Sequence, residues 1–485
     1  MKPPIYNLLT KYISKQRIKF CTPGHKGKIR MRTDNLCRID IENVPRQDSD
    51  TNIMPAITKS QEDIAGIFGA SKSFYLCGGI SGGIYASLAS VCSPGDKVIV
   101  DPECDKSVIN AITILALQPV FLKRSYCARY SLNGGISTAE TENVLTSCSD
   151  AKLVIITSPT YYGVCANIKK IVSSAHARNM LVMVDESHGA HMNFMEKSPD
   201  NALECGADIV VQSLSKTLGG FVGSGLLHLS ESLDKALVAT IEANLDIYQG
   251  DCISTALLCA SENILFYAFA NSGKYHPLLK EIERGKHLIQ TKTDILWFDA
   301  EANNGCDISV TDKTKIVLNF SHVNISADEA AGILLSKYGI EADYSDEDNI
   351  VFSVSLYNTP SEIRKLVNSC LSISRLLSPV EYDEEQDSGT YTTGMFDEGP
   401  RAVMSPYKAF YCSGEWVEPG LAIGKICRKT VCIMPQGTPI IIPGEKISYE
   451  QIDAIKNFVS HGVKIHGLSE LGQIEVLSLS DSFYF

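Results

Sequence analysis

The chain has 485 residues, which is too many for one hydrophobic core, so two or three domains are expected. Its hydrophobic content of 44% and charged content of 21% are ordinary for a soluble globular protein, and its formal net charge of −12 argues against nonspecific nucleic-acid binding. The N-terminus lacks the apolar core of a signal peptide, and no apolar run approaches the roughly 18 residues of a membrane span. These features predict a cytoplasmic protein with no nucleic-acid or membrane partner.

The 16 cysteines are scattered from Cys21 to Cys432 and form no CxxC pair. This spacing argues against zinc ribbons and thioredoxin-type sites. Without a secretory signal, the cysteines are expected to be reduced thiols, most of them small buried apolar residues.

The first 60 residues are expected to form an irregular N-terminal arm. From residue 61 onward, short β-rich runs alternate with helical stretches such as 107–117 and 167–180. Seven runs are predicted as strands: 74–77, 97–101, 119–122, 152–158, 181–186, 208–213 and 223–229. Continuous apolar strands between helices indicate a mostly parallel sheet covered on both faces, so residues 61–300 are predicted to form a large α/β domain.

Residues 301–485 are predicted to form a smaller α+β domain. It contains strand-like runs at 315–320 and 350–356, followed by a helical pattern over 360–377. The acidic stretch 380–399 is typical of a linker or an exposed loop. The last clear helix is expected to begin at Ser448, because Ser448 and Gln451 fit a capping box and Gly462 fits a C-terminal stop.

The first motif with chemical potential is 78-GGISGG-83, which follows a predicted strand and begins a predicted helix. Glycines let backbone amides approach an anion, and a helix N-terminus favours negative charge, so Ser81 and Gly82 are candidate phosphate contacts. The alternative is a glycine-rich turn that binds nothing.

The second motif is 184-VDESHGAH-191, at the end of a predicted strand, where α/β sheets bind their ligands. Three interpretations remain open from this motif alone. Asp185, His188 and His191 have the residue types of a metal site. Asp185 could instead pair with a protonated ring nitrogen, or it could cap a turn beside packed histidines.

The third motif is 212-QSLSKTLGG-220, which places Lys216 directly after an apolar strand. Lys216 follows Asp185 by 31 residues, about one αβ unit, so both are expected at the same edge of the sheet. A phosphate cradle, a carboxylate and a strand-end lysine together are what pyridoxal 5′-phosphate requires, because the lysine binds the aldehyde and the carboxylate keeps the pyridine nitrogen protonated. A metal site leaves Lys216 and the glycine turn unexplained, so no metal is predicted.

With these motifs in view, the chain resembles the fold-type I pyridoxal-phosphate enzymes, specifically the Orn/Lys/Arg decarboxylase family in its short bacterial form. The resemblance covers nearly the whole chain. In the family's order, the motifs are 22-TPGHKG-27, the glycine-rich turn, 103-ECDKSVINA-111, 157-TSPTYYGV-164, 185-DESHGAH-191, 213-SLSKT-217 and 435-PQGTPIIIPGE-445.

The resemblance implies a role for each matching residue. Lys216 would form the Schiff base with the cofactor, Asp185 would pair with the pyridinium nitrogen, and His188 would lie beside the ring. The matching phosphate-contacting positions are Ser81, Gly82, Ser213 and Ser215. The implied reaction is decarboxylation of a basic amino acid to a polyamine-type amine and carbon dioxide, with arginine or lysine favoured and ornithine possible. The implied assembly is at least a homodimer.

Some positions depart from the family pattern. The family usually has His in an NCHKS-like motif, where the imidazole stacks over the cofactor ring; here the position is Asp105, within Glu103–Ser107. Ser215 stands where a His often precedes the lysine, and Ile80 stands where a Ser is common. These departures leave two alternatives: a different substrate or reaction on the same cofactor, such as elimination or transamination, or a degenerate paralogue without turnover.

Other candidates keep two interpretations. The segment with His25 and Lys26 reaches toward the active site in the family, but a surface loop is the alternative. Tyr161 and Tyr162 could line the substrate entrance or pack in the core, and packing is favoured for one of them. His228 is expected to be a core histidine with satisfied hydrogen bonds.

Overall fold

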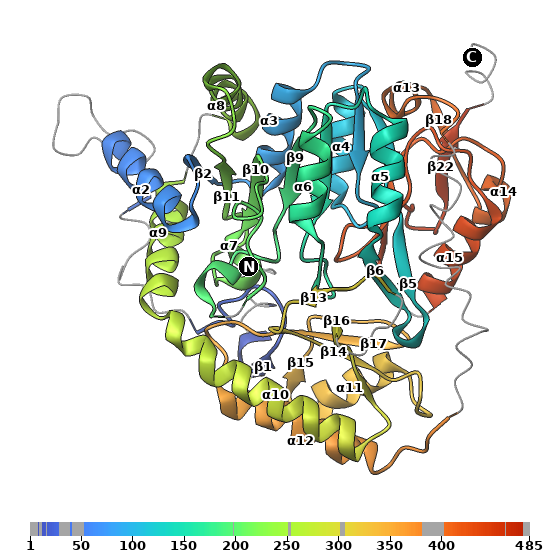
Figure 1. Ribbon diagram of the computed structural model, residues 1–485. Coiled ribbons are helices and arrows are strands. Elements are labelled where there is room, and N and C mark those ends of the chain that lie inside the picture. The colour runs from blue at the N-terminus through green and yellow to red at the C-terminus, as the bar shows by residue number, and fades with distance from the viewer. Residues whose placement is uncertain are drawn as a thin grey trace, which may run out of the picture.

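The computed structural model describes residues 8, 12–15, 17–28, 39–40, 53–196, 198–250, 254–300, 306–380, 402–460 and 462–478 (Figure 1). The acidic stretch predicted as a linker over 380–399 lies outside these residues, apart from Val380. The predicted division into domains stays a prediction, and the sheets and cores below are described by themselves.

A seven-stranded sheet forms the centre of the molecule. Its strands are β2 Lys72–Leu76, β3 Lys97–Val100, β4 Gln118–Phe121, β7 Leu153–Thr157, β9 Leu181–Asp185, β10 Ile209–Ser213 and β11 Gly225–Leu229. The order is β2-β11-β10-β9-β7-β3-β4, and only β11 runs antiparallel to its neighbours. The predicted mostly parallel, seven-stranded sheet is therefore confirmed. Every residue of β7 and β10 is buried, because helices cover both faces.

Successive side chains of each strand point to opposite faces of the sheet, so helices pack against both faces. Leu153 and Ile155 of β7 face a core shared with α3 Ser81–Val91, α4 Lys106–Ile114 and α8 Lys235–Gln249. Val154 and Ile156 face the opposite core, against α5 Thr138–Ser147 and α6 Ile168–His176.

The expectation of an irregular arm over residues 1–60 is wrong in two places. Helix α2 begins at Ile53 and continues to Phe68, and its Pro55 lies in the first turn, where proline is tolerated. It packs with α9 Thr255–Ala270. Strand β1, Ile18–Lys19, pairs in parallel with β15, Ile340–Glu341, so an N-terminal segment joins a distant part of the chain.

A second, four-stranded antiparallel sheet has the order β12-β14-β17-β16. Its strands are β12 Leu296–Trp297, β14 Lys315–Asn319, β16 Tyr344–Ser345 and β17 Asn349–Ser353. Three helices pack against it: α10 Tyr275–Lys292, α11 Ala327–Tyr338 and α12 Pro360–Ser374, which lie along the lower edge in Figure 1. Both α11 and α12 begin with capping boxes.

The residues after 402 pack on the core that α3 and α4 share with the large sheet. The elements are α13 Pro406–Tyr411, β18 Gly414–Val417, α14 Pro419–Ala422, β19 Val431–Ile433, β20 Pro439–Ile441, α15 Tyr449–Ser460, β21 Ile465–His466 and β22 Ile474–Leu477. The capping box predicted at Ser448 and Gln451 is present, with backbone-to-side-chain bonds of 3.0 and 3.2 Å.

Two short pairings were not predicted. A hairpin of β5 Arg124–Cys127 and β6 Leu132–Ile136 extends from the large sheet, and β8 Val164–Cys165 pairs with β13 Val310–Thr311. Cys127 forms a disulfide with Cys306, 179 residues later, so the expectation of reduced thiols is wrong for this pair. Among the described residues, no helix is long and apolar enough to cross a membrane.

Candidate active site

Two neighbouring strands bring Asp185 and Lys216 to one edge of the large sheet. Strand β9 ends at Asp185, which is in register with Val211 of the parallel strand β10. Strand β10 ends at Ser213, and the one-turn helix α7, Leu214–Thr217, carries Lys216. Asp185 and Lys216 therefore lie at the carboxyl ends of adjacent strands, as their spacing of one αβ unit predicted. This is the edge at which α/β folds bind ligands.

Lys216 contacts His188. Its Nζ lies 3.2 Å from His188 Nε2. Burial, together with the charges of Lys216 and Lys315, lowers the pKa of His188 well below its usual value, so the imidazole is neutral. A neutral ring that accepts from the Lys216 ammonium at Nε2 carries its own proton on Nδ1. His188 Nδ1 is buried and has no hydrogen-bond partner among the described residues.

Asp185 is a buried carboxylate with little local compensation. Burial raises its pKa, and the charge of Lys216 and the hydroxyl of Ser187 oppose that rise. The Ser187 backbone amide donates to Asp185 Oδ1 at 3.0 Å, and the Ser187 hydroxyl donates to the same oxygen. A further positive group beside Asp185 would favour the ionised carboxylate.

The glycine-rich turn lies at the same edge. Gly225 of β11 pairs with Leu76 at the end of β2 on one side and with Ser213 at the end of β10 on the other. Gly79 also donates its amide to the Gly223 carbonyl oxygen at 2.7 Å. The turn that precedes α3 is therefore next to the turn that carries Lys216.

Four polar positions of these two turns were predicted to contact phosphate. Ser81 and Gly82 are the first residues of α3, whose N-terminus has no side-chain cap. The hydroxyl oxygens of Ser213 and Ser215 lie 3.1 Å apart. An uncapped helix N-terminus beside two hydroxyls provides free donors for an anion.

Asp105 has a structural role that an imidazole cannot fill in the same way. It is the N-cap of α4, and its Oδ1 accepts from the Ser107 amide at 2.8 Å and from the Ser107 hydroxyl at 2.6 Å. Its charge also contributes to the raised pKa of Asp185. Gly437 of the C-terminal segment lies against its other oxygen, since a Cβ there would lie 2.8 Å from Asp105 Oδ2.

Sequence reasoning missed Lys315 and Asp343. Tyr161 lies between these two residues and Lys216. Its ring centroid is 5.2 Å from the ring centroid of His188 and 4.9 Å from Lys315 Nζ. Lys315 donates to Ser353 Oγ at 2.6 Å and lies 3.5 Å from Asp343 Oδ2. Lys315 begins a buried apolar strand, whereas the signal that singled out Lys216 was a lysine directly after such a strand.

The TPGHKG segment is docked against the turn that carries Lys216. The Gly24 amide donates to the Ser215 carbonyl oxygen at 2.7 Å. Buried Lys26 donates to the carbonyl oxygens of Cys21 and Ser353 at 2.7 and 2.9 Å. The structure therefore supports the first interpretation, in which this segment reaches toward the site, and not the second, in which it is a surface loop.

The histidines outside the site have local partners. His191 lies 3.2 Å from Asp312 Oδ1, whereas Asp185 and His188 contact Ser187 and Lys216. No three His, Cys, Asp or Glu residues in the described part of the chain are grouped as metal ligands. His228 is a core histidine with partners at Ser73 and Gln212, as predicted.

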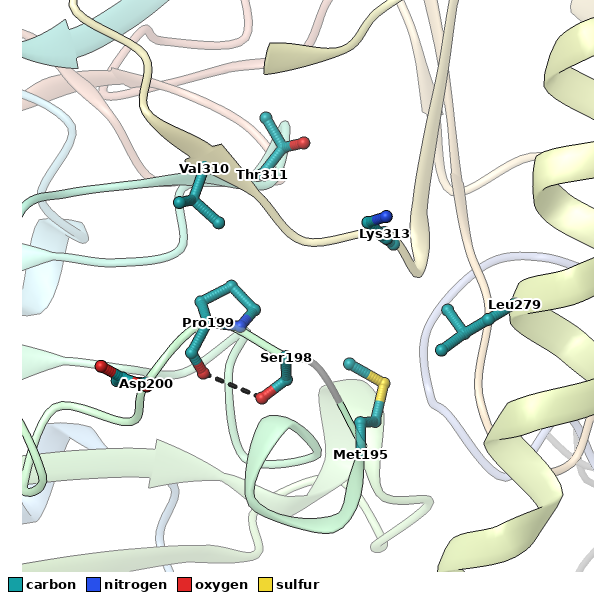
Figure 2. Close-up of a pocket in the computed structure, with 8 residues that line it drawn as sticks. All are labelled: Met195, Ser198, Pro199, Asp200, Leu279, Val310, Thr311 and Lys313. Carbon is teal, nitrogen blue, oxygen red and sulfur yellow. Dashed lines mark hydrogen bonds between the residues drawn. The ribbon is translucent and has the colours of Figure 1, made fainter. Parts of the chain in front are cut away.

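A separate cavity of about 290 Å³ lies beside β13 (Figure 2). Its lining residues are Met195, Ser198, Pro199, Asp200, Leu279, Val310, Thr311 and Lys313. None of the predicted site residues lines it, and the Ser198 hydroxyl is already bonded to the Pro199 carbonyl oxygen.

Comparison with known proteins agrees with this geometry. The family model of "Orn/Lys/Arg decarboxylase, major domain" matches residues 3–314. The chain belongs to the Orn/Lys/Arg decarboxylase family. The expected enzyme class, an amino-acid decarboxylase, is confirmed by this membership.

Relatives resemble this chain over nearly its full length. An arginine decarboxylase of Bacillus subtilis is 29% identical over 475 residues, covering 96% of this chain and 95% of the relative. An arginine decarboxylase of Bacillus anthracis is also 29% identical, with the same coverage. Among solved structures, a lysine decarboxylase of Francisella novicida matches with a TM-score of 0.74 at 17% identity, over 98% of this chain and 81% of the other. The expected fold-type I architecture of the decarboxylase family is thereby confirmed.

Proposed function

We propose that this decarboxylase family member uses pyridoxal 5′-phosphate to decarboxylate a basic amino acid, with arginine as the first candidate and lysine and ornithine as the others. The products would be carbon dioxide and the corresponding polyamine-type amine. The observation that carries the proposal is the placement of Lys216 and Asp185 at the ends of adjacent strands, beside the uncapped N-terminus of α3. The relatives named arginine decarboxylase favour arginine.

The residues present fit this cofactor. In the part of the chain that the structure describes, Lys216 is the one cation that acts on Asp185, and a protonated pyridine nitrogen would supply another. His188 Nδ1 is a buried polar atom that no described residue contacts by a hydrogen bond, and a bound group can satisfy it. Ser81, Gly82, Ser213 and Ser215 would hold the phosphate, and Asp105 would lie at the edge of the ring site. When bound, the cofactor supplies an electron sink for the bond that breaks.

The side chains of this chain would then have distinct tasks. Lys216 Nζ would hold the cofactor covalently and release it to the substrate amine. Asp185 would keep the ring nitrogen protonated. Neutral His188, 3.2 Å from Lys216 Nζ, would accept a hydrogen bond from that amine at Nε2 and hold it in position.

Substrate profiling tests the proposal. Purified protein is incubated with arginine, lysine and ornithine, and the amine and carbon dioxide are quantified. Amine and carbon dioxide in equal amounts from at least one substrate are expected. No turnover of any of the three would refute the assignment.

A second candidate function is favoured by Asp105, which is negatively charged where the family usually has an imidazole. On that basis the same cofactor could support elimination or transamination, and a keto-acid product without carbon dioxide would identify it. A chain that gives neither product and no visible absorbance from lysine-bound cofactor would be a non-catalytic paralogue.

The proposal includes a homodimer or higher homo-oligomer. Helix α9 exposes large apolar side chains, with Phe269 60% and Phe266 40% exposed, and Met54 of the adjacent α2 is 61% exposed. Burial of such side chains favours association. Light scattering after size-exclusion chromatography is expected to give at least twice the mass of one chain, and a monomer would contradict this part.

A further inference from the structure

A group of six polar side chains gathers around the hydroxyl of Tyr162, and we name it the Tyr162 cluster. Its members come from five separate segments of the chain: Glu103, Asn133, Tyr162, Tyr344, Asp346 and Gln436. Tyr162 donates to Asp346 Oδ2 at 3.1 Å. The charges of Glu103 and Asp346 and the hydroxyl of Tyr344 all act on the Tyr162 hydroxyl and, with burial, raise its pKa well above the usual value.

The cluster holds two carboxyl groups, those of Glu103 and Asp346. Asp346 Oδ1 already accepts from the backbone amides of Asp348 and Asn349 at 3.0 and 2.7 Å. Among the described residues, neither Glu103 nor Asp346 takes part in an ion pair. Arg124 acts on Glu103 at longer range, but its guanidinium is bonded to Asp101 at 2.8 and 2.6 Å. Burial raises the pKa of Glu103, and burial raises the pKa of Asp346 to about 7. Such carboxylates are stabilised by a cation that arrives with a ligand.

Two neutral acceptors in the cluster are also unused. Asn133 donates its amide to Glu103 Oε1, and its own Oδ1 is buried without a partner among the described residues. Gln436 bonds to the Tyr344 hydroxyl, and its Oε1 is likewise buried without a partner. A buried acceptor without a donor is costly, so each of these two oxygens is available to accept a hydrogen bond from a bound group.

The side chain of Tyr161 separates the cluster from His188 and Lys216. The Tyr161 ring centroid is 6.2 Å from that of Tyr162 and 5.8 Å from that of Tyr344. On its other side, the same ring lies 5.2 Å from His188, whose Nε2 is 3.2 Å from Lys216 Nζ. Glu103 is also two residues before Asp105, in the loop that follows β3.

We propose that the Tyr162 cluster is the subsite for the distal guanidinium of the substrate, an inference that rests on the proposed decarboxylase function. Glu103 supplies the main charge, because none of the described residues donates to its Oε2. Asp346, which directly follows β16 of the four-stranded sheet, supplies the second charge.

The acceptors suit a guanidinium better than an ammonium. A guanidinium has five N–H donors in one plane, whereas an ammonium has three around a single nitrogen. The acceptors without a donor among the described residues are Asn133 Oδ1 and Gln436 Oε1, which are buried, and Glu103 Oε2. A planar, multidentate cation can reach several of them at once, and bidentate carboxylate contacts are the strongest of these bonds.

The test compares arginine with citrulline, in which a neutral ureido group replaces the guanidinium. The kcat/KM of each is measured for the holoenzyme and for the near-isosteric variants Glu103→Gln and Asp346→Asn. In both variants arginine is expected to lose about 100-fold in kcat/KM while citrulline changes less than about threefold. Citrulline thus reports on folding within the same variant. The matched control is Glu231→Gln, an exposed position for which no change is expected.

Direct binding separates this inference from the proposed function. Butylguanidine and its neutral isostere butylurea are titrated into the holoenzyme by calorimetry, which requires no turnover. The inference predicts that only butylguanidine binds, and about 100-fold more weakly to Glu103→Gln. Equal binding of the two compounds, or equal affinity in wild type and variant, overturns it even if arginine is decarboxylated. Failure of decarboxylation with intact, Glu103-dependent butylguanidine binding overturns only the proposed reaction.

Discussion

The backbone amide of Gly24 donates a 2.7 Å hydrogen bond to the carbonyl oxygen of Ser215, the residue before Lys216. This bond joins segments 191 positions apart in the sequence (215 − 24). On the far side of the same turn, Gly219 lies against the ring of Tyr357, since a Cβ there would lie 2.4 Å from Tyr357 Cε2. The position of Lys216 is therefore fixed from both sides by contacts distant in the chain.

Gly24→Ala is expected to move the Lys216 turn. An added Cβ would lie 3.0 Å from Gly219 N and 3.1 Å from both Lys216 O and Thr217 C, and backbone atoms cannot rotate away. A displacement of this kind can lower kcat about 100-fold. The readouts are kcat and the visible absorbance of lysine-bound cofactor. Gly332→Ala, in α11 with open space around it, is the matched control, and equal activity in both variants would contradict the positioning role.

Lys216→Ala is expected to abolish both turnover and the visible absorbance of covalently held pyridoxal phosphate. The reason is that Lys216 is the only amine proposed to bind the cofactor aldehyde. Spectra of the purified protein with added cofactor check this outcome. Lys313→Ala removes a lysine that is 57% exposed outside the site and should keep both properties. A Lys216→Ala protein with an unchanged absorbance band would show that another group holds the cofactor.

Asp185→Asn is expected to weaken cofactor binding about 100-fold, because a neutral amide cannot compensate a buried ring cation. Burial already raises the pKa of Asp185, so its ionised form depends on a nearby positive group. Titration with pyridoxal phosphate, followed by absorbance, measures the change. Unchanged affinity would argue that the ring nitrogen binds elsewhere. Asp150→Asn, at a surface position paired with Lys97, serves as the control.

The discrimination between arginine and citrulline is expected to rise with pH. Asp346 has a pKa of about 7, so it is largely protonated at pH 6 and ionised at pH 8, where it attracts the guanidinium. The groups that face it are Asp348 and the phenols of Tyr162 and Tyr344, and the raised pKa values keep both phenols neutral in this range. The ratio of the two kcat/KM values should increase about tenfold from pH 6 to 8. In Asp346→Asn this increase should become smaller, and the part that remains belongs to Glu103, whose pKa burial also raises. An unchanged increase would assign the titration to a group other than Asp346.

Arg124→Met is expected to lower the free energy of unfolding by about 3 to 5 kcal/mol, because it leaves the Asp101 carboxylate buried without its partner. The two side chains are 1% and 0% exposed, and the guanidinium also donates to the carbonyl oxygens of Gly134 and Thr157. Urea unfolding followed by fluorescence measures the change. Lys97→Met removes a surface ion pair and should shift the midpoint far less. Similar shifts in the two variants would mean that the buried pair is not a stabilising contact.

The large sheet could be predicted from the sequence because its signals are local. Each of the seven predicted runs overlaps an observed strand, since continuous apolar runs bounded by turns need both faces covered. The neighbourhood of Asp185 and Lys216 followed from the same pattern, because parallel strands meet at one edge. The capping box at Ser448 depends only on residues three apart and was equally predictable.

The remaining parts of the site depend on contacts that no local pattern encodes. Lys315 is close to Tyr161 because two segments far apart in the sequence pack together. Gly437 contacts Asp105 although more than 300 residues separate them. The departure at Asp105 looked like a missing imidazole, yet its use as the N-cap of α4 becomes visible only once the helix start at Lys106 is known. The Cys127–Cys306 pairing likewise required the three-dimensional proximity of two segments.

The contact between Gly437 and Asp105 has a consequence for biosynthesis. Domains form as the chain leaves the ribosome, N-terminal parts first, so β3 and α4 can take shape long before residue 437 is made. Until then, the face of Asp105 that Gly437 covers is open to water. A chain that ends before residue 437 therefore lacks the contact that covers Asp105 in the finished structure, and this wall beside the N-terminus of α4 is among the last parts to form.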